Sequence, residues 1–443
     1  MERVNPLLDT DSYKAGHYAY YPEGAREITS YLTARGGPPG YSNVLFFGLQ
    51  AVLLEHFSDP ITEADVEEAA VFFSEHGEPF NRDGWLDIAL RGGYLPVEVC
   101  ALLEGERAAF GEPLVVVRNT RPGFHWLPSY IETKLMRVWY PTTVATYSAR
   151  LRQLVDNYVA LTSDDPSVAP FRVHDFGSRG STSQESAALG GMAHLVNFLG
   201  TDTVVGVVGA QRWYGAGMAG YSVIATEHST MTTWGEVGEF DAFEAMLDRH
   251  ARPGAIISVV SDSYDTRRVL TEYLPRLREK IEASGATVVV RLDSGDPVDQ
   301  VMFALNSLAG TFGSRLNSMG YAVLSPSVRV LQGDGIDDRT VDAILGRMAA
   351  ERYAIDNVVF GMGGALLQKH NRDTFKFAYK ACQLKLEGGE VREVSKRSED
   401  GWKASKTLAQ LDTSRLVPVF RDGRLLVSTS FDEVRARAAG GVA

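Results

Sequence analysis

The stretch VVVRLDSGDP, at residues 288–297, decides the fold because an apolar run passes directly into charged residues and a glycine. Valine side chains are branched at Cβ and pack well on a pleated surface, so residues 288–290 predict a buried strand. Arg291, Asp293 and Asp296 follow at once, where a strand of the core should end. The sequence therefore places polar groups at the C-terminal end of a buried strand.

This strand belongs to a series of about seven apolar runs that alternate with amphipathic segments. The runs are FRVHDFG, DTVVGVVGA, YSVIATEHS, AIISVVSDS, TVVVRLDSG, SVRVLQGDG and DNVVFGMGG. Between them lie segments of helical period, such as STSQESAALGGMAHLVNFLG, EFDAFEAMLDRHA and DRTVDAILGRMAAERYA. Such alternation predicts parallel strands with helical crossovers, and the number of units favours an irregular α/β (TIM-like) barrel over an open sheet.

The two ends of the chain predict a second domain of a different kind. The segment up to about Ala145 is loop-rich, with short strand-like runs between Gly and Pro turns. Near the C-terminus, LVPVFRDGRLLVSTS is typical of a β-hairpin turning at Asp422 and Gly423, and Ser430 is placed to cap a helix. We therefore expect an α+β domain formed by residues 1–145 with 380–443, beside a barrel domain formed by residues 146–379.

Composition excludes several classes of protein. The chain has 443 residues, of which 44% are hydrophobic and 23% charged, as expected of a soluble enzyme. A net charge of −12 disfavours nonspecific nucleic-acid binding, and no apolar stretch is long enough to span a membrane. Two cysteines and an N-terminal segment that contains acids, where a signal peptide needs an apolar run, indicate a cytoplasmic protein.

Six of the apolar runs end in residues that can carry chemistry: HDFGSRG, EHS, SDSYD, RLDSGD, QGDG and GMGG. In α/β barrels the active site is built from the loops at the C-terminal ends of the strands. Asp262, Asp293 or Ser294 could instead cap the helix that follows, and for each residue alone capping is the better explanation. Six such endings together favour a shared active site.

Glycines and basic residues point to a phosphate ligand. The GDG at residues 333–335 and the GMGG at residues 361–364 offer backbone N–H groups without side chains, although each could simply be a tight turn. A basic run between Lys369 and Lys406 follows, and it could equally be a solvated surface. Asp293 and Asp334 are placed to bind sugar hydroxyls or Mg²⁺ carried by phosphates. Neither cysteines nor clustered histidines suggest zinc.

The order and spacing of ten motifs give the chain a family resemblance. They are TDSYKAGHY, HDFGSRGSTSQE, HLVNFLGTDTV, ATEHST, VVSDSYD, RLDSGDP, QGDGID, GGALLQK, NRD and TSFDEVR. With them the chain resembles, nearly end to end, the nicotinate/nicotinamide phosphoribosyltransferase family of type II phosphoribosyltransferases. It departs from the family pattern at Ser178, Leu292, Met362 and Ala365, which predicts a different shape of the tunnel behind the pyridine.

The resemblance implies a glycosyltransferase of NAD salvage, which condenses nicotinamide with phosphoribosyl pyrophosphate to nicotinamide mononucleotide and pyrophosphate. It also implies Mg²⁺ as cofactor, ATP as a coupled substrate, and a homodimer with shared active sites. Two other functions stay open: a nicotinate phosphoribosyltransferase, and a non-catalytic binding protein on the same scaffold.

Residues that match the family's pyridine site follow from the same resemblance. Phe176 is expected to stack on one face of the pyridine and Tyr13, from a partner subunit, on the other, since flat apolar faces suit a flat ring. Asp202 is expected to accept hydrogen bonds from the carboxamide, while its charge repels nicotinate. Ser258 and Arg291 are expected to make further contacts with nicotinamide.

The resemblance also assigns residues to the sugar and the phosphates. Asp293 and Asp334 are expected to contact the ribose and the Mg²⁺ side, with Asp293 as the metal ligand. The residues expected around the phosphates are Gly333, Gly363, Gly364 and Arg179 for the phosphoribosyl group, and Arg35, Arg372 and Lys380 for pyrophosphate or ATP across a dimer interface.

His228 is the expected phosphoryl acceptor. In the family the matching histidine is transiently phosphorylated by ATP, and a neutral imidazole is a competent nucleophile for phosphorus. Asp262 matches the carboxylate that orients this histidine, and the neighbouring Glu227 is expected to tune the site. Taken alone, any single histidine of the nine is more often structural or exposed.

Overall fold

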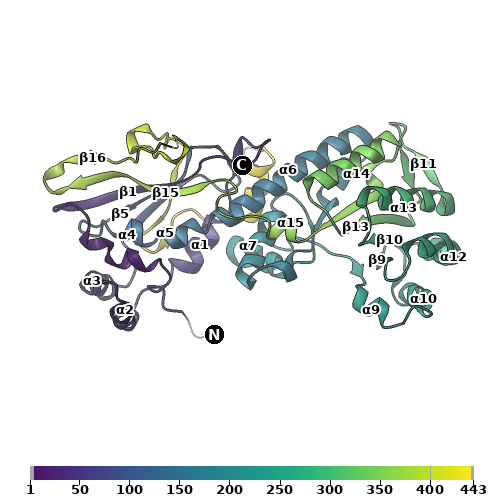
Figure 1. Cartoon of the computed structure of the whole chain (residues 1–443), viewed down its shortest axis with the longest axis horizontal. Coiled ribbons are helices and arrows are strands. Elements are labelled where there is room, and N and C mark those ends of the chain that lie inside the picture. Colours follow the sequence, from purple (N-terminus) through teal and green to yellow (C-terminus); the bar gives the residue numbers. More distant parts are fainter. Residues whose placement is uncertain (1–3, 400, 441–443) are drawn as a thin grey trace. The chain divides into compact units, whose positions relative to one another are not determined.

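The structure is a computed structural model that describes residues 4–399 and 401–440. By its internal contacts the chain divides into two units. Unit 1 comprises Met1–Thr146, Gly209–Gly217 and His370–Ala443, and unit 2 comprises Tyr147–Val208 and Met218–Lys369. The domain limits inferred from the sequence stay a prediction, and each unit is described below by itself (Figure 1).

Unit 2 is built around a parallel sheet of seven strands in the order β7-β6-β14-β13-β10-β9-β8. The strands are β6 (Val173–Asp175), β7 (Gly200–Thr201), β8 (Ile224–Ala225), β9 (Ile256–Val260), β10 (Thr287–Leu292), β13 (Val328–Gln332) and β14 (Val358–Met362). A parallel bridge between Gly200 and Tyr221 joins edge strand β7 to the segment that leads into the other edge strand, β8. The sheet therefore curves into an irregular barrel, and the predicted α/β fold class is confirmed.

Helices connect the strands of unit 2, as parallel strands require. They are α7 (Gln184–Leu195), α9 (His228–Thr232), α10 (Glu239–His250), α11 (Thr266–Arg268), α12 (Leu274–Ser284), α13 (Pro297–Phe312), α14 (Asp338–Ala350) and α15 (Gly364–Leu367). A π-helical turn, η4 (Val269–Tyr273), joins α11 to α12, and a hairpin of β11 (Ser314–Leu316) and β12 (Ala322–Leu324) follows α13. Helices α6 (Trp139–Thr162) and α8 (Val204–Tyr214) each continue from one unit into the other.

The predicted strand in DTVVGVVGA is wrong. Only Gly200–Thr201, just before this run, is a strand, and the valines belong to helix α8. An apolar run of this length cannot be told from a buried helix by periodicity alone. Helix α8 approaches α7 closely, because a Cβ on Gly206 would lie 2.8 Å from the backbone of Gly191. This close helix contact overrides the strand propensity of the valines.

Unit 1 is built around an antiparallel sheet in the order β16-β15-β1-β5-β3-β17-β18. Its strands are β1 (Ala25–Ala34), β3 (Val97–Ala101), β5 (Pro113–Asn119), β15 (Phe377–Leu386), β16 (Val391–Glu393), β17 (Val417–Arg421) and β18 (Arg424–Leu425), with a small separate ladder of β2 (Asn43–Leu45) and β4 (Arg107–Ala109). Its helices are η1 (Ser12–Ala19), α1 (Leu49–His56), α2 (Glu63–His76), α3 (Arg82–Leu90), α4 (Leu127–Tyr130), α5 (Glu132–Met136) and α16 (Phe431–Ala438).

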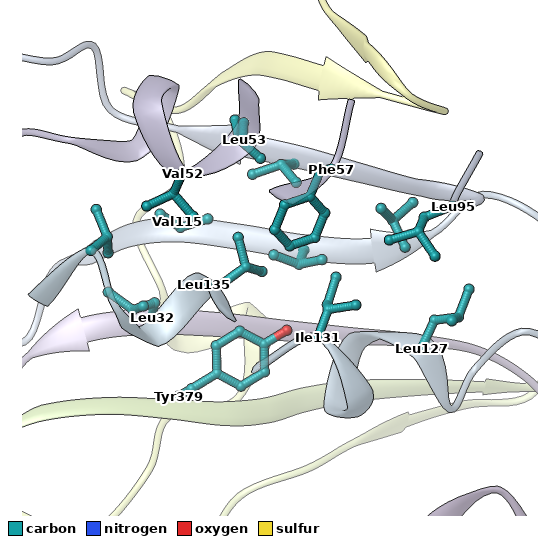
Figure 2. Packing of buried hydrophobic residues seen from close by; sticks show 14 of the residues in the cluster. Leu32, Val52, Leu53, Phe57, Leu95, Val115, Leu127, Ile131, Leu135 and Tyr379 are labelled. Carbon is teal, nitrogen blue, oxygen red and sulfur yellow. The ribbon is translucent and has the colours of Figure 1, made fainter. Parts of the chain in front are cut away.

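The core of unit 1 lies where short helices meet this sheet. Figure 2 shows Leu127, Ile131 and Leu135 facing the strands that carry Leu32 and Val115. At the C-terminal end, the predicted hairpin and helix cap are both confirmed. Strands β17 and β18 pair through a turn in which Asp422 and Gly423 have positive φ, and Ser430 caps α16. In the part of the chain that the structure describes, no helix is long and apolar enough to cross a membrane.

Candidate active site

One face of the barrel sheet carries several of the predicted site residues. Side chains of residues paired across parallel strands point to the same face, and so do residues two apart on one strand. Arg291 on β10 is paired with Leu331 on β13, and Ser258 on β9 is paired with Val289. Gly361 on β14 is paired with His174 on β6. Following these pairs around the sheet, Ser258, Arg291 and His174 share one face.

Phe176 identifies this face as the inside of the barrel. It directly follows β6, and its backbone N–H donates to the Met362 carbonyl at 2.9 Å. Its ring fills the space beside Gly361, where a Cβ would lie only 2.2 Å from a ring carbon. The guanidinium of Arg291 lies 5.1 Å from the ring centre. The barrel thus holds a half-buried aromatic ring with a cation beside it.

Asp202 directly follows β7, the strand that pairs with β6. Its backbone N–H donates to the Asp175 carbonyl at 2.9 Å. Its Oδ1 accepts hydrogen bonds from His174 Nε2 at 3.1 Å and from Ser222 Oγ. Burial opposes ionisation of Asp202, but these hydrogen bonds and the charge of Arg291 outweigh it and lower the pKa of the carboxyl. Asp202 is therefore a negative charge held by a histidine that packs against the Phe176 ring.

A chain of polar contacts links three strand ends. His228 Nε2 lies 2.9 Å from Asp262 Oδ1, and His228 Nδ1 lies 3.8 Å from Asp293 Oδ2. The same Asp293 oxygen accepts a hydrogen bond from Arg291 at 2.9 Å. The imidazole is 44% exposed, whereas the Asp262 side chain behind it is only 5% exposed. An accessible imidazole backed by a buried carboxylate is the arrangement of a nucleophile or a general base.

Three loops at this end of the barrel contain two aspartates three residues apart, and the two have different roles. The second aspartate of each pair caps the next helix: Asp265 for α11, Asp296 for α13 and Asp337 for α14. The first aspartates, Asp262, Asp293 and Asp334, are therefore not needed as caps. The capping role that the sequence left open for Asp262 and Asp293 belongs to their neighbours, and Ser294 is not the cap of α13 either.

The rim also contains the space that a phosphorylated ligand needs. A Cβ on Gly333 would lie 2.7 Å from Asp293 Oδ1 and 3.4 Å from Arg291 Nε, so glycine keeps this position free of a side chain that would crowd both atoms. Arg291 Nε is buried, and no described residue accepts its hydrogen. Among the described residues, no atom lies within 4 Å of a Cβ built on Gly364, and only the Phe176 backbone lies within 4 Å of a Cβ built on Gly363. Both face open space at the start of α15.

The remaining predicted residues of unit 2 have less definite surroundings. Arg179 is exposed in the short helix η3 (Ser178–Gly180), and Asp334 is exposed after β13. Ser258 is 2% exposed and faces the barrel interior. Glu227 is the N-cap residue of α9 and forms a capping box with Thr230, so its local role is to start the helix that carries His228.

Four predicted residues, Tyr13, Arg35, Arg372 and Lys380, belong to unit 1. Tyr13 lies in η1 and is 55% exposed. Burial lowers the pKa of the Arg35 guanidinium, and Arg372 lowers it further. Burial likewise lowers the pKa of Lys380, and the positive charges of Arg35, Lys396 and Lys14 add to this effect against Glu132. A bound anion would relieve this repulsion.

Sequence reasoning missed two residues that contact Asp202. His174 stands two residues before Phe176 at the end of a strand, so the two-residue period of a strand could have placed both inside the barrel. Ser222 lies in a loop between Tyr221 and β8, and nothing in its sequence context indicates a partner 20 residues away.

Comparison with known proteins shows which family the sequence matches. The Nicotinate phosphoribosyltransferase (NAPRTase) family matches residues 171–416, and the Nicotinamide phosphoribosyltransferase, N-terminal domain matches residues 5–99. The chain is 46% identical to a nicotinamide phosphoribosyltransferase of Xanthomonas campestris, with 98% of each chain covered. It is 32% identical to a nicotinamide phosphoribosyltransferase of Acinetobacter baylyi, with 99% of this chain and 97% of the relative covered.

Solved structures share the fold at lower identity. The crystal structure of nicotinate-nucleotide pyrophosphorylase from Pyrococcus furiosus matches with a TM-score of 0.58 and 15% identity, covering 99% of this chain and 98% of that chain. The crystal structure of human nicotinic acid phosphoribosyltransferase matches with a TM-score of 0.57 and 18% identity, covering 98% of this chain and 93% of that chain. At this identity the likeness concerns the fold alone.

Proposed function

Because the chain belongs to the nicotinate phosphoribosyltransferase family and is thus a pentosyltransferase, we propose that its pyridine substrate is nicotinamide. It would transfer the phosphoribosyl group of phosphoribosyl pyrophosphate to the ring nitrogen, giving nicotinamide mononucleotide and pyrophosphate in NAD salvage. The observation that carries this choice is Asp202, a negative charge whose hydrogen-bond partner His174 packs edge-on against the Phe176 ring. A carboxylate accepts hydrogen bonds from a neutral carboxamide and repels the carboxylate of nicotinate.

The chemistry asks the protein mainly to position its substrates. Breaking the bond between C1 of the ribose and pyrophosphate builds positive charge on the sugar, and the pyridine nitrogen then bonds to C1. The Asp293 carboxylate lies where it can stabilise that positive charge, and its hydrogen bond from Arg291 keeps it oriented. The buried Arg291 Nε, which lacks an acceptor among the described residues, would be satisfied by an oxygen of the ligand.

Magnesium fits this site only as an ion carried by the diphosphate. Within residues 4–399 and 401–440, no group of three or more His, Cys, Asp or Glu side chains is arranged to hold a metal. Mg²⁺ commonly binds through one or two carboxylates together with substrate phosphates. Asp293 Oδ1, which faces the space kept open by Gly333, would be the protein ligand. Bound there, the ion would neutralise charge on the leaving pyrophosphate.

His228 is the proposed site at which ATP enters the cycle. With Nε2–H donating to Asp262, the lone pair of Nδ1 is left to attack the γ-phosphorus of ATP, so that ADP leaves and a phosphohistidine forms. Water then hydrolyses this phosphohistidine. The proposal is supported by the exposure of the imidazole and by the burial of Asp262.

The cations of unit 1 are proposed to act in the site of a second copy of the chain. Arg35, Arg372 and Lys380 would bind the pyrophosphate or ATP phosphates, and the exposed Tyr13 would stack on the pyridine, in a homodimer with shared active sites. The gathering of like charges supports an anionic ligand at this place. The cytoplasm is the proposed compartment, since both cysteines are unpaired and suit a reducing environment.

Turnover of nicotinamide and nicotinate by the purified chain, measured side by side as pyrophosphate release, tests the choice of substrate. Nicotinamide should be preferred, and Asp202→Asn should lower the ratio of kcat/KM for nicotinamide over nicotinate by about tenfold or more. A wild type that prefers nicotinate would favour a nicotinate phosphoribosyltransferase. Absence of pyrophosphate release with every pyridine would favour a non-catalytic protein.

A further inference from the structure

Asp202 receives two hydrogen bonds on one and the same oxygen. His174 Nε2 and Ser222 Oγ both donate to Asp202 Oδ1. A carboxylate oxygen has two lone pairs in its plane, so these donors saturate Oδ1. The two donors thereby leave Oδ2 as the oxygen that a ligand can reach.

The first donor, His174, is held rigidly. Its side chain is 11% exposed. Its Nδ1 lies against Gly200, where a Cβ would approach to 2.8 Å, and its ring meets the Phe176 ring edge-on at 5.2 Å. The imidazole therefore cannot turn away from Asp202 without displacing β7 or Phe176.

The second donor, Ser222, is exposed but lies on a fixed segment. The preceding residue, Tyr221, donates its N–H to the Leu199 carbonyl at 2.7 Å and accepts from the Thr201 N–H at 3.0 Å. These bonds fasten the segment to β7, which ends just before Asp202. The serine hydroxyl is therefore kept within reach of Asp202 although solvent surrounds it.

Given the proposed role of Asp202 as the acceptor of the carboxamide, we infer that His174 and Ser222 set the pyridine selectivity. They are positioning residues that fix the orientation of the Asp202 carboxylate, with Oδ2 turned to the ligand. Removal of either donor frees the carboxylate to rotate and leaves its charge less stabilised in a partly buried place. The acceptance of an amide and the repulsion of a carboxylate both weaken as a result.

Substitution of each donor tests this inference on the full chain. His174→Met removes the donor and keeps a side chain of similar size, and His174→Gln offers an amide N–H at about the place of Nε2. Ser222→Ala removes the second donor from an exposed position, where folding is at little risk. KM and kcat are measured for nicotinamide, and nicotinate is measured as a substrate and as a competitor of nicotinamide.

His174→Met should lower kcat/KM for nicotinamide by about tenfold or more, mainly through KM, and should lower the selectivity over nicotinate by a similar factor. His174→Gln should recover most of both losses, and Ser222→Ala should give a smaller loss of the same kind. In an Asp202→Asn background, His174→Met should change selectivity by less than about threefold. A structural role would instead lower the turnover of both pyridines equally.

Two outcomes separate the inference from the proposed function. If the wild type prefers nicotinate or uses neither pyridine, the proposed function itself is wrong. If the wild type prefers nicotinamide and His174→Met leaves that preference unchanged, only the inference about His174 and Ser222 is wrong. If His174→Met shows no thermal unfolding transition, the variant is not folded and Ser222→Ala decides instead. An unchanged preference for nicotinamide in Ser222→Ala would then show that the inference is wrong.

Discussion

The two units surround their basic side chains differently. At the strand ends of unit 2, carboxylates alternate with nitrogen-bearing side chains: the His228 imidazole lies between Asp262 and Asp293, and Arg291 donates to Asp293. In unit 1, burial lowers the pKa of Lys380, and the nearby cations Arg35, Lys396 and Lys14 lower it further against the effect of Glu132. These polar contacts of unit 2 are formed without a ligand, whereas a bound anion would relieve the repulsion around Lys380 in unit 1. We therefore expect the side chains of unit 2 to be held in place before a ligand binds, and the cations of unit 1 to be stabilised when an anion binds.

The largest expected effect is the loss of the nucleophile from the alternating chain of unit 2. His228→Ala should reduce ATP hydrolysis on the order of 10,000-fold or more, because the attacking nitrogen is gone. Some condensation without ATP should remain, because Phe176 and Asp202 do not depend on this imidazole. Measurement of ADP and nicotinamide mononucleotide formation in the same reaction checks both statements. His250→Ala, at the end of α10, serves as the control that should leave ATP hydrolysis unchanged.

Survival of ATP hydrolysis in His228→Ala would contradict the phosphohistidine proposal without affecting the choice of pyridine.

The next largest effect is expected for Asp293, and Asp296 in the same loop serves as its control. Asp293→Asn removes the charge that faces Arg291 and His228, and should lower kcat on the order of 100- to 1,000-fold. It should also destabilise the protein by about 2–3 kcal/mol, because the Arg291 side chain is only 13% exposed and loses its ionic partner. Asp296→Asn should change neither quantity much, since asparagine caps a helix as well as aspartate does. Steady-state kinetics and thermal unfolding of both variants test the expected changes in kcat and in stability.

Equal losses in Asp293→Asn and Asp296→Asn would show that the loop acts as a whole and that the division into a site residue and a cap is wrong.

The contrast between these aspartates also explains how far the sequence could predict the site. The valine run of β10 and its polar ending follow from side-chain shape and from strand–helix alternation, and both predictions are confirmed. The capping role could have been assigned as well, because Asp265, Asp296 and Asp337 each immediately precede a helix. An N-cap residue must stand next to the first helical residue, and the aspartate three positions earlier cannot do so.

Other parts of the site depend on tertiary contacts that leave no local signal. The valines of α8 favour a strand, and only the close approach of Gly206 to Gly191 explains the helix. The hydrogen bond from Ser222 to Asp202 joins a loop residue to a strand end. The bond exists because Tyr221 bridges to β7, a contact that depends on how the barrel curves. The shape of the closed sheet, not the local sequence, therefore determines this part of the site.

The smallest expected effect concerns two lysines on one strand of unit 1. Lys380 and Lys385 both lie on β15, but Lys385 forms an ion pair with Glu27 at 2.7 Å, whereas the pKa of Lys380 is lowered by burial and by neighbouring cations. Lys380→Met should raise KM for phosphoribosyl pyrophosphate by about tenfold, and should leave stability unchanged or slightly higher because repulsion is relieved. Lys385→Met should leave that KM unchanged but cost about 1–3 kcal/mol of stability, because Glu27 Oε1 is buried and loses its partner. Kinetics at two salt concentrations and thermal unfolding check both expectations.

If the KM for phosphoribosyl pyrophosphate changes equally with the two substitutions, the cations of unit 1 act only through their overall positive charge. Lys380 then has no specific role in binding the phosphates.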